Sequence, residues 1–254
     1  MLIDTHCHLD AREFDPDRET LVAAAREQGV AAWIVPGVAA VDFPRLRACC
    51  AVYPGSFAAY GLHPLYVREA HEEDVDVLDD WLHRERPVAV GEIGLDCYLP
   101  ELDLPRQERF FAAQLKLARK HDLPVILHVR RAVDQIVGHL RRVPVRGGIA
   151  HAFNGSRQQA ETLIALGFKL GFGGAMTYSG STRIRHLAAT LPLSAIVLET
   201  DAPDIPPAWL NRGRNTPAEL LPIAREFAAL RQLPLEQVVS EIGANVRTLF
   251  PRVG

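Results

Sequence analysis

The chain has 254 residues, of which 48% are hydrophobic and 23% are charged, and this length fits one large globular domain or two small ones. Its formal net charge of −3 argues against a broadly basic surface for binding long duplexes, although a local phosphate site remains possible. The four cysteines include no CxxC pair, so the sequence indicates neither a disulfide framework nor a cysteine metal site.

The N-terminal segment MLIDTHCHLD has no basic region followed by a long apolar stretch, so no signal peptide is evident. No window of the chain approaches the roughly 18 apolar residues of a membrane span. We therefore expect a cytoplasmic protein without membrane contact, and we predict no stable protein partner.

Short apolar runs alternate with longer amphipathic stretches along the chain. The runs, which we predict to be strands, are residues 2–7, 30–38, 57–62, 88–93, 124–129, 148–153, 168–172 and 195–198. Their weak polar–apolar alternation is typical of strands buried on both faces of a parallel sheet. Helical patterns cover residues 17–28, 74–85, 106–121, 156–166, 217–230 and 235–249.

Eight strands separated by helical stretches predict an α/β protein with a closed (β/α)₈ TIM barrel, formed by one domain over residues 1–254. An open, doubly wound sheet is the main alternative, because strand counting does not exclude it. In a barrel of this kind, the active site lies at the carboxyl ends of the strands. Polar residues able to bind metal should therefore cluster where the apolar runs end.

The first run ends in His6-Cys7-His8. Residues two apart on a strand point the same way, so His6 and His8 can face the barrel interior together. The alternative is a pair of partly buried, hydrogen-bonded histidines. The fourth run contains Glu92, whose carboxylate must be paired with an arginine or bound to metal if it is buried. Asp96 follows it and is expected either to orient a ligating imidazole or to cap the next segment.

The fifth and sixth runs end in His128 and His151, and the eighth leads into Asp201. Each of these residues alone could be structural, and Asp201 could simply begin a turn before Pro203. Glu199 lies two residues before Asp201 and could contact a metal ligand without binding the metal itself. Taken together, the imidazoles and carboxylates suit Zn²⁺, Mn²⁺ or Mg²⁺.

Six candidate ligands exceed what one catalytic ion requires, so we predict two divalent ions. We expect His6, His8 and Asp201 to hold one ion, His128 and His151 to hold the other, and Glu92 to bridge them. Such a pair lowers the pKa of bound water and stabilises the attacking and leaving oxygens of a displacement at phosphorus, with Asp201 as a possible general base.

His63 ends the third run in GLHP, where no metal position remains vacant for it. It could bind a phosphate oxygen or protonate the leaving oxygen, and the alternative is a structural histidine. Several arginines fall near the same end of the predicted barrel, and arginine suits phosphate. They are Arg130, Arg131, Arg183, Arg185, Arg212 and Arg214, and no single one is favoured.

Six segments, IDTHCHLD, GLHP, GEIGLD, VILHVR, HAFNGS and LETDAP, resemble in order the motifs of the TatD family of metal-dependent hydrolases and deoxyribonucleases. The segment RNTPAEL and the closing Asn245 to Phe250 resemble its last blocks, so the match covers residues 2 to about 250. GGAMTY and ETDAPDIP look closest to the YjjV-like branch. GLDCY and ETDAPDIP depart from the family's usual GLDYY and ETDAPYL, beside the ligand positions.

The resemblance implies an amidohydrolase-like TIM barrel and a divalent-metal site formed by His6, His8, Glu92, His128, His151 and Asp201. It also implies phosphodiester hydrolysis, with 3′→5′ trimming of DNA ends. A carbon–nitrogen or carboxyl-ester hydrolase, such as an aminoacyl-tRNA deacylase, is the alternative. Many two-metal amidohydrolases bridge their ions with a modified lysine on strand four, and this chain offers Glu92 there instead. A non-catalytic binding protein is disfavoured because all six ligand candidates are present.

Overall fold

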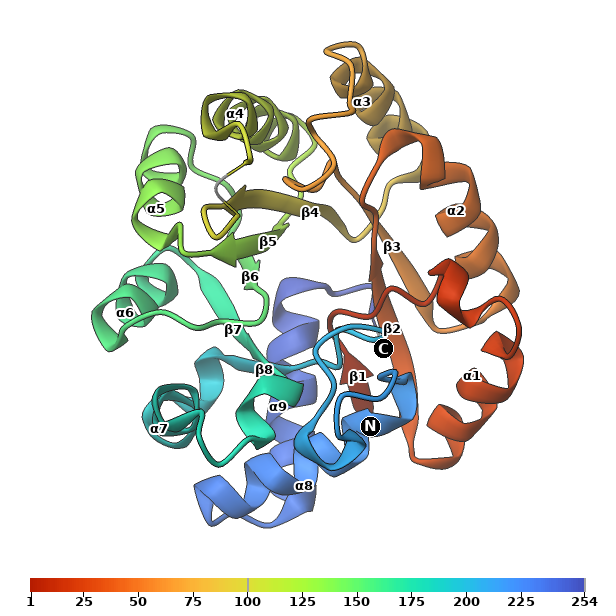
Figure 1. The fold of residues 1–254 in the computed structure, drawn as a ribbon, viewed down its shortest axis with the longest axis vertical. Coiled ribbons are helices and arrows are strands. Elements are labelled where there is room, and N and C mark those ends of the chain that lie inside the picture. Colours follow the sequence, from red (N-terminus) through yellow and green to blue (C-terminus); the bar gives the residue numbers. More distant parts are fainter. Residues whose placement is uncertain (100, 254) are drawn as a thin grey trace.

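The computed structural model describes residues 1–99 and 101–253, and its centre is a barrel of eight parallel strands (Figure 1). The strands are β1 (Leu2–Asp4), β2 (Val30–Pro36), β3 (Ser56–Tyr60), β4 (Ala89–Asp96), β5 (Val125–Arg130), β6 (Gly148–Ala150), β7 (Phe168–Phe172) and β8 (Ile196–Leu198). They pair strictly in chain order, from β1 to β8.

The segments that continue β1 and β8 bring the two edges of the sheet together. Thr5 N donates to Leu198 O at 3.2 Å, and Asp201 N donates to His6 O at 2.8 Å. The barrel is therefore nearly closed, which confirms the predicted fold. The open, doubly wound alternative is wrong, because its strand order would reverse partway across the sheet.

Helices surround the barrel on the outside (Figure 1). They are α1 (Arg18–Glu27), α2 (Phe43–Val52), α3 (Asp74–Glu85), α4 (Leu104–Lys120), α5 (Val133–Arg142), α6 (Arg157–Ala165), α7 (Thr182–Thr190), α8 (Leu220–Arg231) and α9 (Leu235–Leu249). Short 3₁₀ helices are η1 (Arg12–Phe14), η2 (Ala40–Asp42), η3 (Gly174–Thr177), η4 (Leu193–Ala195), η5 (Ala208–Leu210) and η6 (Pro217–Glu219).

The helical patterns in the sequence correspond to α1, α3, α4, α6, α8 and α9, whereas α2, α5 and α7 were not predicted. These three have nine or ten residues each, as do α1 and α6, so length alone does not distinguish them from the predicted helices. Helices this short are stabilised mainly by packing against the rest of the protein. At α6 the local signal is strong, because Ser156 Oγ accepts from Gln159 N and Gln159 Oε1 accepts from Ser156 N.

An apolar core fills the part of the barrel toward the amino ends of the strands. Its inward-facing side chains belong to one cluster with the C-terminal residues Val246, Leu249, Phe250 and Val253. Leu249 and Phe250 also line a small cavity with Val88 and Pro124, which immediately precede β4 and β5. The C-terminal segment therefore closes the amino ends of the strands, and the carboxyl ends remain for the polar site. Among the described residues, no helix has the length and apolar character needed to cross a bilayer.

Candidate metal centre

Four strands bring a polar side chain to the barrel mouth, His128 within β5 and the other three in the segments that follow β3, β6 and β8. Each of these side chains lies two or four positions after an apolar residue of the interior core. The pairs are Ala59 and His63, Ile126 and His128, Ile149 and His151, and Val197 and Asp201.

Glu92 breaks this spacing, because it lies three positions after the interior residue Ala89. The pairing of β4 with β5 shifts its register between Val90 and Ile93, so the strand has an irregularity at this point. Gly91 permits it, since a Cβ atom there would lie 2.7 Å from Cβ of Ile126. The irregularity turns a carboxylate into the barrel where a regular strand would have kept it outside.

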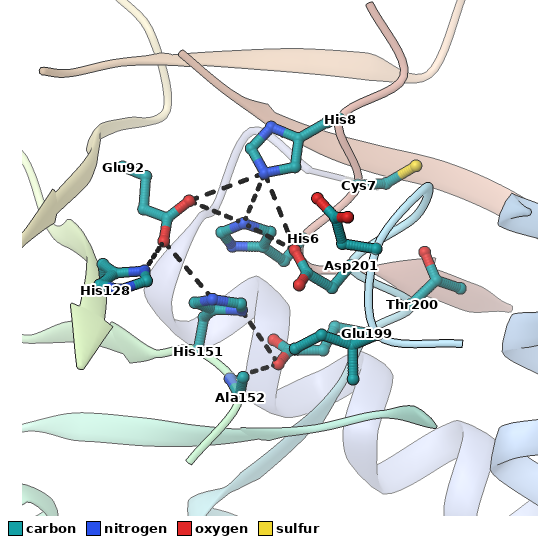
Figure 2. Close-up of polar contacts among 12 residues, drawn as sticks. His6, Cys7, His8, Glu92, His128, His151, Ala152, Glu199, Thr200 and Asp201 are labelled. Atoms are coloured by element: carbon teal, nitrogen blue, oxygen red, sulfur yellow. Dashed lines mark hydrogen bonds and ion pairs between the residues drawn. The ribbon is translucent and has the colours of Figure 1, made fainter. Parts of the chain in front are cut away.

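The two oxygens of Glu92 face two different groups of histidines (Figure 2). Oε2 lies 3.1 Å from His6 Nε2 and 3.7 Å from His8 Nε2. Oε1 lies 2.9 Å from His128 Nδ1 and 3.4 Å from His151 Nε2. Glu92 is 1% exposed, so all of these contacts occur away from bulk solvent.

Asp201 completes the group around His6 and His8. Its Oδ1 atom lies 3.4 Å from His6 Nε2 and 3.8 Å from His8 Nε2. Three sets of side chains have ligand atoms within 4.8 Å of one another. The sets are His6, His8 and Asp201; His6, Glu92 and His151; and His63, Glu92 and His128. All six predicted ligands thus converge at one place.

The donor chemistry of this cluster fits divalent cations. Nε2 of His6 and Nε2 of His8 face each other at 3.3 Å, an arrangement that requires a proton or a cation near one of the lone pairs. On His128, Nε2 lies 3.0 Å from Asp96 Oδ2 and must carry the hydrogen, because a carboxylate only accepts. Its Nδ1 lies 2.9 Å from Glu92 Oε1, a contact that requires a proton or a cation between the two atoms, so Nδ1 is the nitrogen that would face a metal ion.

Asp96 and Glu199 lie next to the ring nitrogens of His128 and His151 that do not face Glu92, as expected from the sequence. Asp96 also accepts from Tyr98 N at 2.8 Å, so it both orients His128 and begins the following loop. Glu199 accepts from Ala152 N at 2.6 Å and lies 3.4 Å from His151 Nδ1 (Figure 2). Gly171 leaves room for it, because a Cβ atom there would lie 2.2 Å from Glu199 Oε2.

His63 enters the site with a defined hydrogen-bonding role. The backbone N–H of Leu65 donates to its Nδ1 at 3.2 Å, so Nε2 carries the hydrogen of the neutral ring. That Nε2 lies 3.0 Å from His128 Nδ1 and 3.4 Å from Glu92 Oε1. His63 is therefore at the centre as a donor rather than as a lone pair for a cation.

Charge within the cluster is strongly coupled. Burial alone would raise the pKa of Glu92, but the surrounding imidazoles, led by His63 and His6, hold it well below the usual range. Burial acts to lower the pKa of His151, yet the carboxylates around it, beginning with Asp201, raise it to about 10. Burial raises the pKa of Asp201 to about 7. Without metal, the site therefore holds the Glu92 carboxylate beside a protonated His151 imidazole. Both side chains can bind a cation in their deprotonated forms.

One supporting residue was not anticipated from the sequence. Asp4 is fully buried, and its carboxylate accepts from Thr200 Oγ1 at 2.6 Å, from Thr200 N at 2.9 Å and from His6 N at 3.3 Å. It fixes the histidine-bearing end of β1 to the segment that carries Asp201. The available signal was a carboxylate inside an apolar run, two positions before His6.

Comparison with known proteins agrees with this geometry. The family described as TatD related DNase matches residues 3–251. The uncharacterized metal-dependent hydrolase YjjV of Escherichia coli is 39% identical, with 98% of this chain and 97% of YjjV aligned. The chain belongs to the TatD family.

Other TatD-family proteins agree in sequence and in structure. A crystal structure of the TatD homologue YjjV from Escherichia coli superimposes with a TM-score of 0.95 at 38% identity, covering 98% of each chain. A protein named 3′-5′ ssDNA/RNA exonuclease TatD from a Pantoea species is 32% identical, with 98% of this chain and 99% of that protein aligned. This chain is accordingly a metal-dependent hydrolase of the TatD family.

Of the six arginines considered in the sequence, three line the cleft, two make structural contacts, and Arg212 does neither among the described residues. Arg130, Arg131 and Arg183 line a cleft of about 1540 Å³ above the centre. Arg185 binds Met176 O and Glu226, and Arg214 binds Glu13 O and Asp17, so these two arginines make structural contacts.

Proposed function

We propose that this TatD-family hydrolase cleaves phosphodiester bonds at the ends of nucleic-acid chains, removing nucleotides from 3′ ends of DNA with two divalent ions. The observation that carries the proposal is the division of the Glu92 carboxylate, whose Oε2 faces His6 and His8 while Oε1 faces His128 and His151. One carboxylate between two separate groups of nitrogen ligands is the arrangement needed for a bridge between two cations.

In this proposal, His6, His8 and Asp201 hold one ion, His128 and His151 hold the second, and Glu92 contacts both. Bound divalent ions of the Zn²⁺, Mn²⁺ or Mg²⁺ type would lower the pKa of water and stabilise negative charge on phosphoryl oxygens. Asp96 fixes the ring orientation of His128, and Glu199 provides a negative charge 3.4 Å from Nδ1 of His151.

Asp201 is the proposed general base. It lies at the mouth of the barrel, lines the cleft, and is next to the histidines proposed to hold one of the ions, so a water activated there would be within its reach. A carboxylate within hydrogen-bond reach can take a proton from an attacking water.

His63 is proposed to stabilise the substrate phosphate. Burial lowers its pKa to about 4, so the ring is neutral at physiological pH. With Nδ1 occupied by the Leu65 N–H, the Nε2–H group points into the site. A neutral imidazole is a weak acid, so we assign His63 to hydrogen bonding with a phosphate oxygen rather than to protonation of the leaving oxygen.

The substrate class rests on relatedness and on the bridging residue. The related Pantoea protein carries the name of a 3′-5′ single-stranded DNA and RNA exonuclease. Strand β4 provides Glu92 and contains no lysine, whereas many two-metal amidohydrolases use a modified lysine at that position. Both observations favour phosphodiesters over amides and carboxyl esters.

The test compares metal-loaded protein with chelated protein on single-stranded DNA, duplex DNA, RNA, bis(4-nitrophenyl) phosphate and an acylated tRNA. We expect chelator-sensitive phosphodiester cleavage that shortens DNA from the 3′ end. Glu92→Gln keeps the side-chain shape and should lower turnover by about a hundredfold or more, because one charged bridge is lost.

Hydrolysis of the acylated tRNA alone would favour the carboxyl-ester reading instead. Undiminished turnover by Glu92→Gln would contradict the proposed role of the bridge, whatever the substrate. Metal content, measured by mass spectrometry on the same samples, separates a loss of ions from a loss of chemistry.

A further inference from the structure

The cleft above the metal centre has walls of opposite charge. Its wall after β1, β2 and β3 contains five carboxylates, from Asp10, Glu13, Asp42, Glu69 and Asp74, and two guanidinium groups, from Arg12 and Arg45. The wall formed after β4 and β5 and by α7 contains three guanidinium groups, from Arg130, Arg131 and Arg183, and one carboxylate, from Asp134. We call these the acidic wall and the basic wall. The acidic wall comes from the part of the chain between β1 and α3, and the basic wall from the part between β4 and α7.

Two arginines of the basic wall are held in place by stacking on an aromatic ring. The guanidinium carbon of Arg130 lies 3.9 Å from the ring centre of Tyr98, and that of Arg131 lies 4.7 Å from the same ring. Stacking of this kind fixes the planes of guanidinium groups while their N–H groups remain available. Tyr98 is itself 45% exposed, so the assembly is open to a ligand in the cleft.

This assembly is connected to the metal centre through Asp96. Its Oδ1 atom accepts from Tyr98 N at 2.8 Å, and its Oδ2 atom lies 3.0 Å from His128 Nε2 and 3.8 Å from Arg130 Nη1. One carboxylate therefore sets the position of a proposed ligand, an aromatic ring and a guanidinium group. The position of the stacked arginines relative to His128 is therefore set by a shared buried residue.

Arg183 extends the basic wall beyond the stack. Its Nη2 atom donates to Asn154 Oδ1 at 2.7 Å, so its guanidinium group has a neutral partner and keeps its full charge. Within the described parts of the chain, no carboxylate forms an ion pair with Arg131. On the acidic wall, by contrast, Arg45 is paired with Asp15.

The size of the cleft also points to an extended ligand. Its volume of about 1540 Å³ exceeds the ~300–1,000 Å³ of pockets that enclose one small molecule. Aromatic rings combined with arginines along a groove are the usual means of holding single-stranded nucleic acid without reading its sequence.

We propose that Arg131 and Arg183, with Tyr98 as the stacking support, bind backbone phosphates of a single-stranded nucleic acid as it leaves the metal centre along the basic wall. The inference rests on the proposed function for its substrate class and adds the path that the substrate takes. The acidic wall repels the same polyanion, so the strand has one exit direction.

The test measures binding of a fluorescein-labelled, single-stranded eight-nucleotide DNA to the full-length protein by anisotropy, in chelator so that nothing is cleaved. Arg131→Ala and Arg183→Ala should each weaken binding about tenfold, the value expected for one lost charge-assisted contact. The slope of log affinity against log salt should shrink by about 0.7 for each variant.

Arg12→Ala is the matched control, because Arg12 is an exposed arginine that lines the same cleft on the acidic wall. It should change affinity less than twofold and leave the salt slope unaltered. Equal losses in Arg12→Ala and Arg131→Ala would overturn the proposal, since general charge would then explain binding. Failure of the wild-type protein to bind the oligonucleotide would overturn it as well.

A second measurement separates this inference from the proposed function. Arg131→Ala and Arg183→Ala should lose much more activity on the oligonucleotide than on bis(4-nitrophenyl) phosphate, because that ester has a single phosphate and no flanking backbone phosphates for the two arginines to bind. Oligonucleotide binding without any phosphodiester cleavage would refute the proposed function and leave the basic wall in place. If the protein cleaves phosphodiesters but Arg12→Ala and Arg131→Ala weaken oligonucleotide binding equally, only the proposed binding path is refuted.

Discussion

At the scale of single residues, the same side-chain type performs different tasks according to which ring nitrogen is already engaged. His128 offers Nδ1 to the centre because Asp96 accepts from its Nε2. His63 offers an N–H group because the Leu65 N–H occupies its Nδ1. A sequence shows that a histidine ends a strand, but the tautomer depends on a neighbour that only the folded backbone supplies.

This distinction predicts different outcomes for two histidine substitutions. His63→Ala should lower turnover of a phosphodiester by about a hundredfold while the protein still binds its full complement of metal, because a hydrogen-bond donor is lost and no ligand is removed. The loss should be similar at pH 6 and pH 8, since burial lowers the pKa of His63 to about 4 and the ring stays neutral at both values.

Metal content by mass spectrometry and initial rates on the same preparation measure both effects. His128→Ala is the comparison, and it should lose metal as well as activity. Loss of metal from His63→Ala would identify that residue as a ligand and contradict the donor role.

The identities of the proposed ligands were easier to predict than their supports. His6, His8, Glu92, His128, His151 and Asp201 stand out because each is polar at or near the end of an apolar run. Asp4 did not stand out, since its partner Thr200 is 196 positions away. Tyr98 was also missed, because the sequence does not show that Arg130 and Arg131, more than 30 positions later, stack on its ring.

At the scale of strands and helices, the boundaries show where pattern reasoning fails. The apolar run at residues 2–7 continues past β1, whose sheet pairing ends at Asp4. The run at residues 148–153 likewise outlasts β6, which ends at Ala150. In both, the residues that follow the ladder carry the site histidines, and hydrophobicity alone does not reveal where backbone pairing stops.

The irregularity of β4 was equally hidden, and it leads to a prediction about Gly91. Gly91→Ala should lower the free energy of unfolding by about 1–3 kcal/mol, because the added methyl group would overlap Ile126 and force β4 and β5 apart. Metal affinity should fall too, since Glu92 is the next residue. Urea denaturation and calorimetric metal titration measure the two effects.

Gly180→Ala is the control for this substitution, because a Cβ atom at Gly180 would meet nothing within 4 Å. Its stability and metal affinity should match those of the wild type. If Gly91→Ala behaves in the same way, the close approach of β4 and β5 does not position Glu92.

At the scale of the whole molecule, the barrel topology was predicted from the eight apolar runs and from the helical stretches recognised in four of the seven intervals between them. The opposite charges of the two cleft walls were not legible in the sequence, because their residues come from many separate loops and elements spread between Asp10 and Arg183. Closure of the barrel was also undetermined, since it depends on contacts between the first and last strands. The expectation of one domain over residues 1–254 stays a prediction.

The C-terminal segment provides a test of that expectation. Phe250 is 1% exposed and belongs to the interior cluster that includes Ile3 of β1 and Val197 of β8. Phe250→Ala should therefore destabilise the entire barrel by about 3–5 kcal/mol, and unfolding should remain a single transition. Circular dichroism and tryptophan fluorescence, followed together in urea, should give coincident curves. Val41→Ala, at a position 83% exposed, should change stability by less than about 0.5 kcal/mol. Two separated transitions would show that the chain contains more than one folding unit, and unchanged stability would show that the C-terminal segment does not support the barrel.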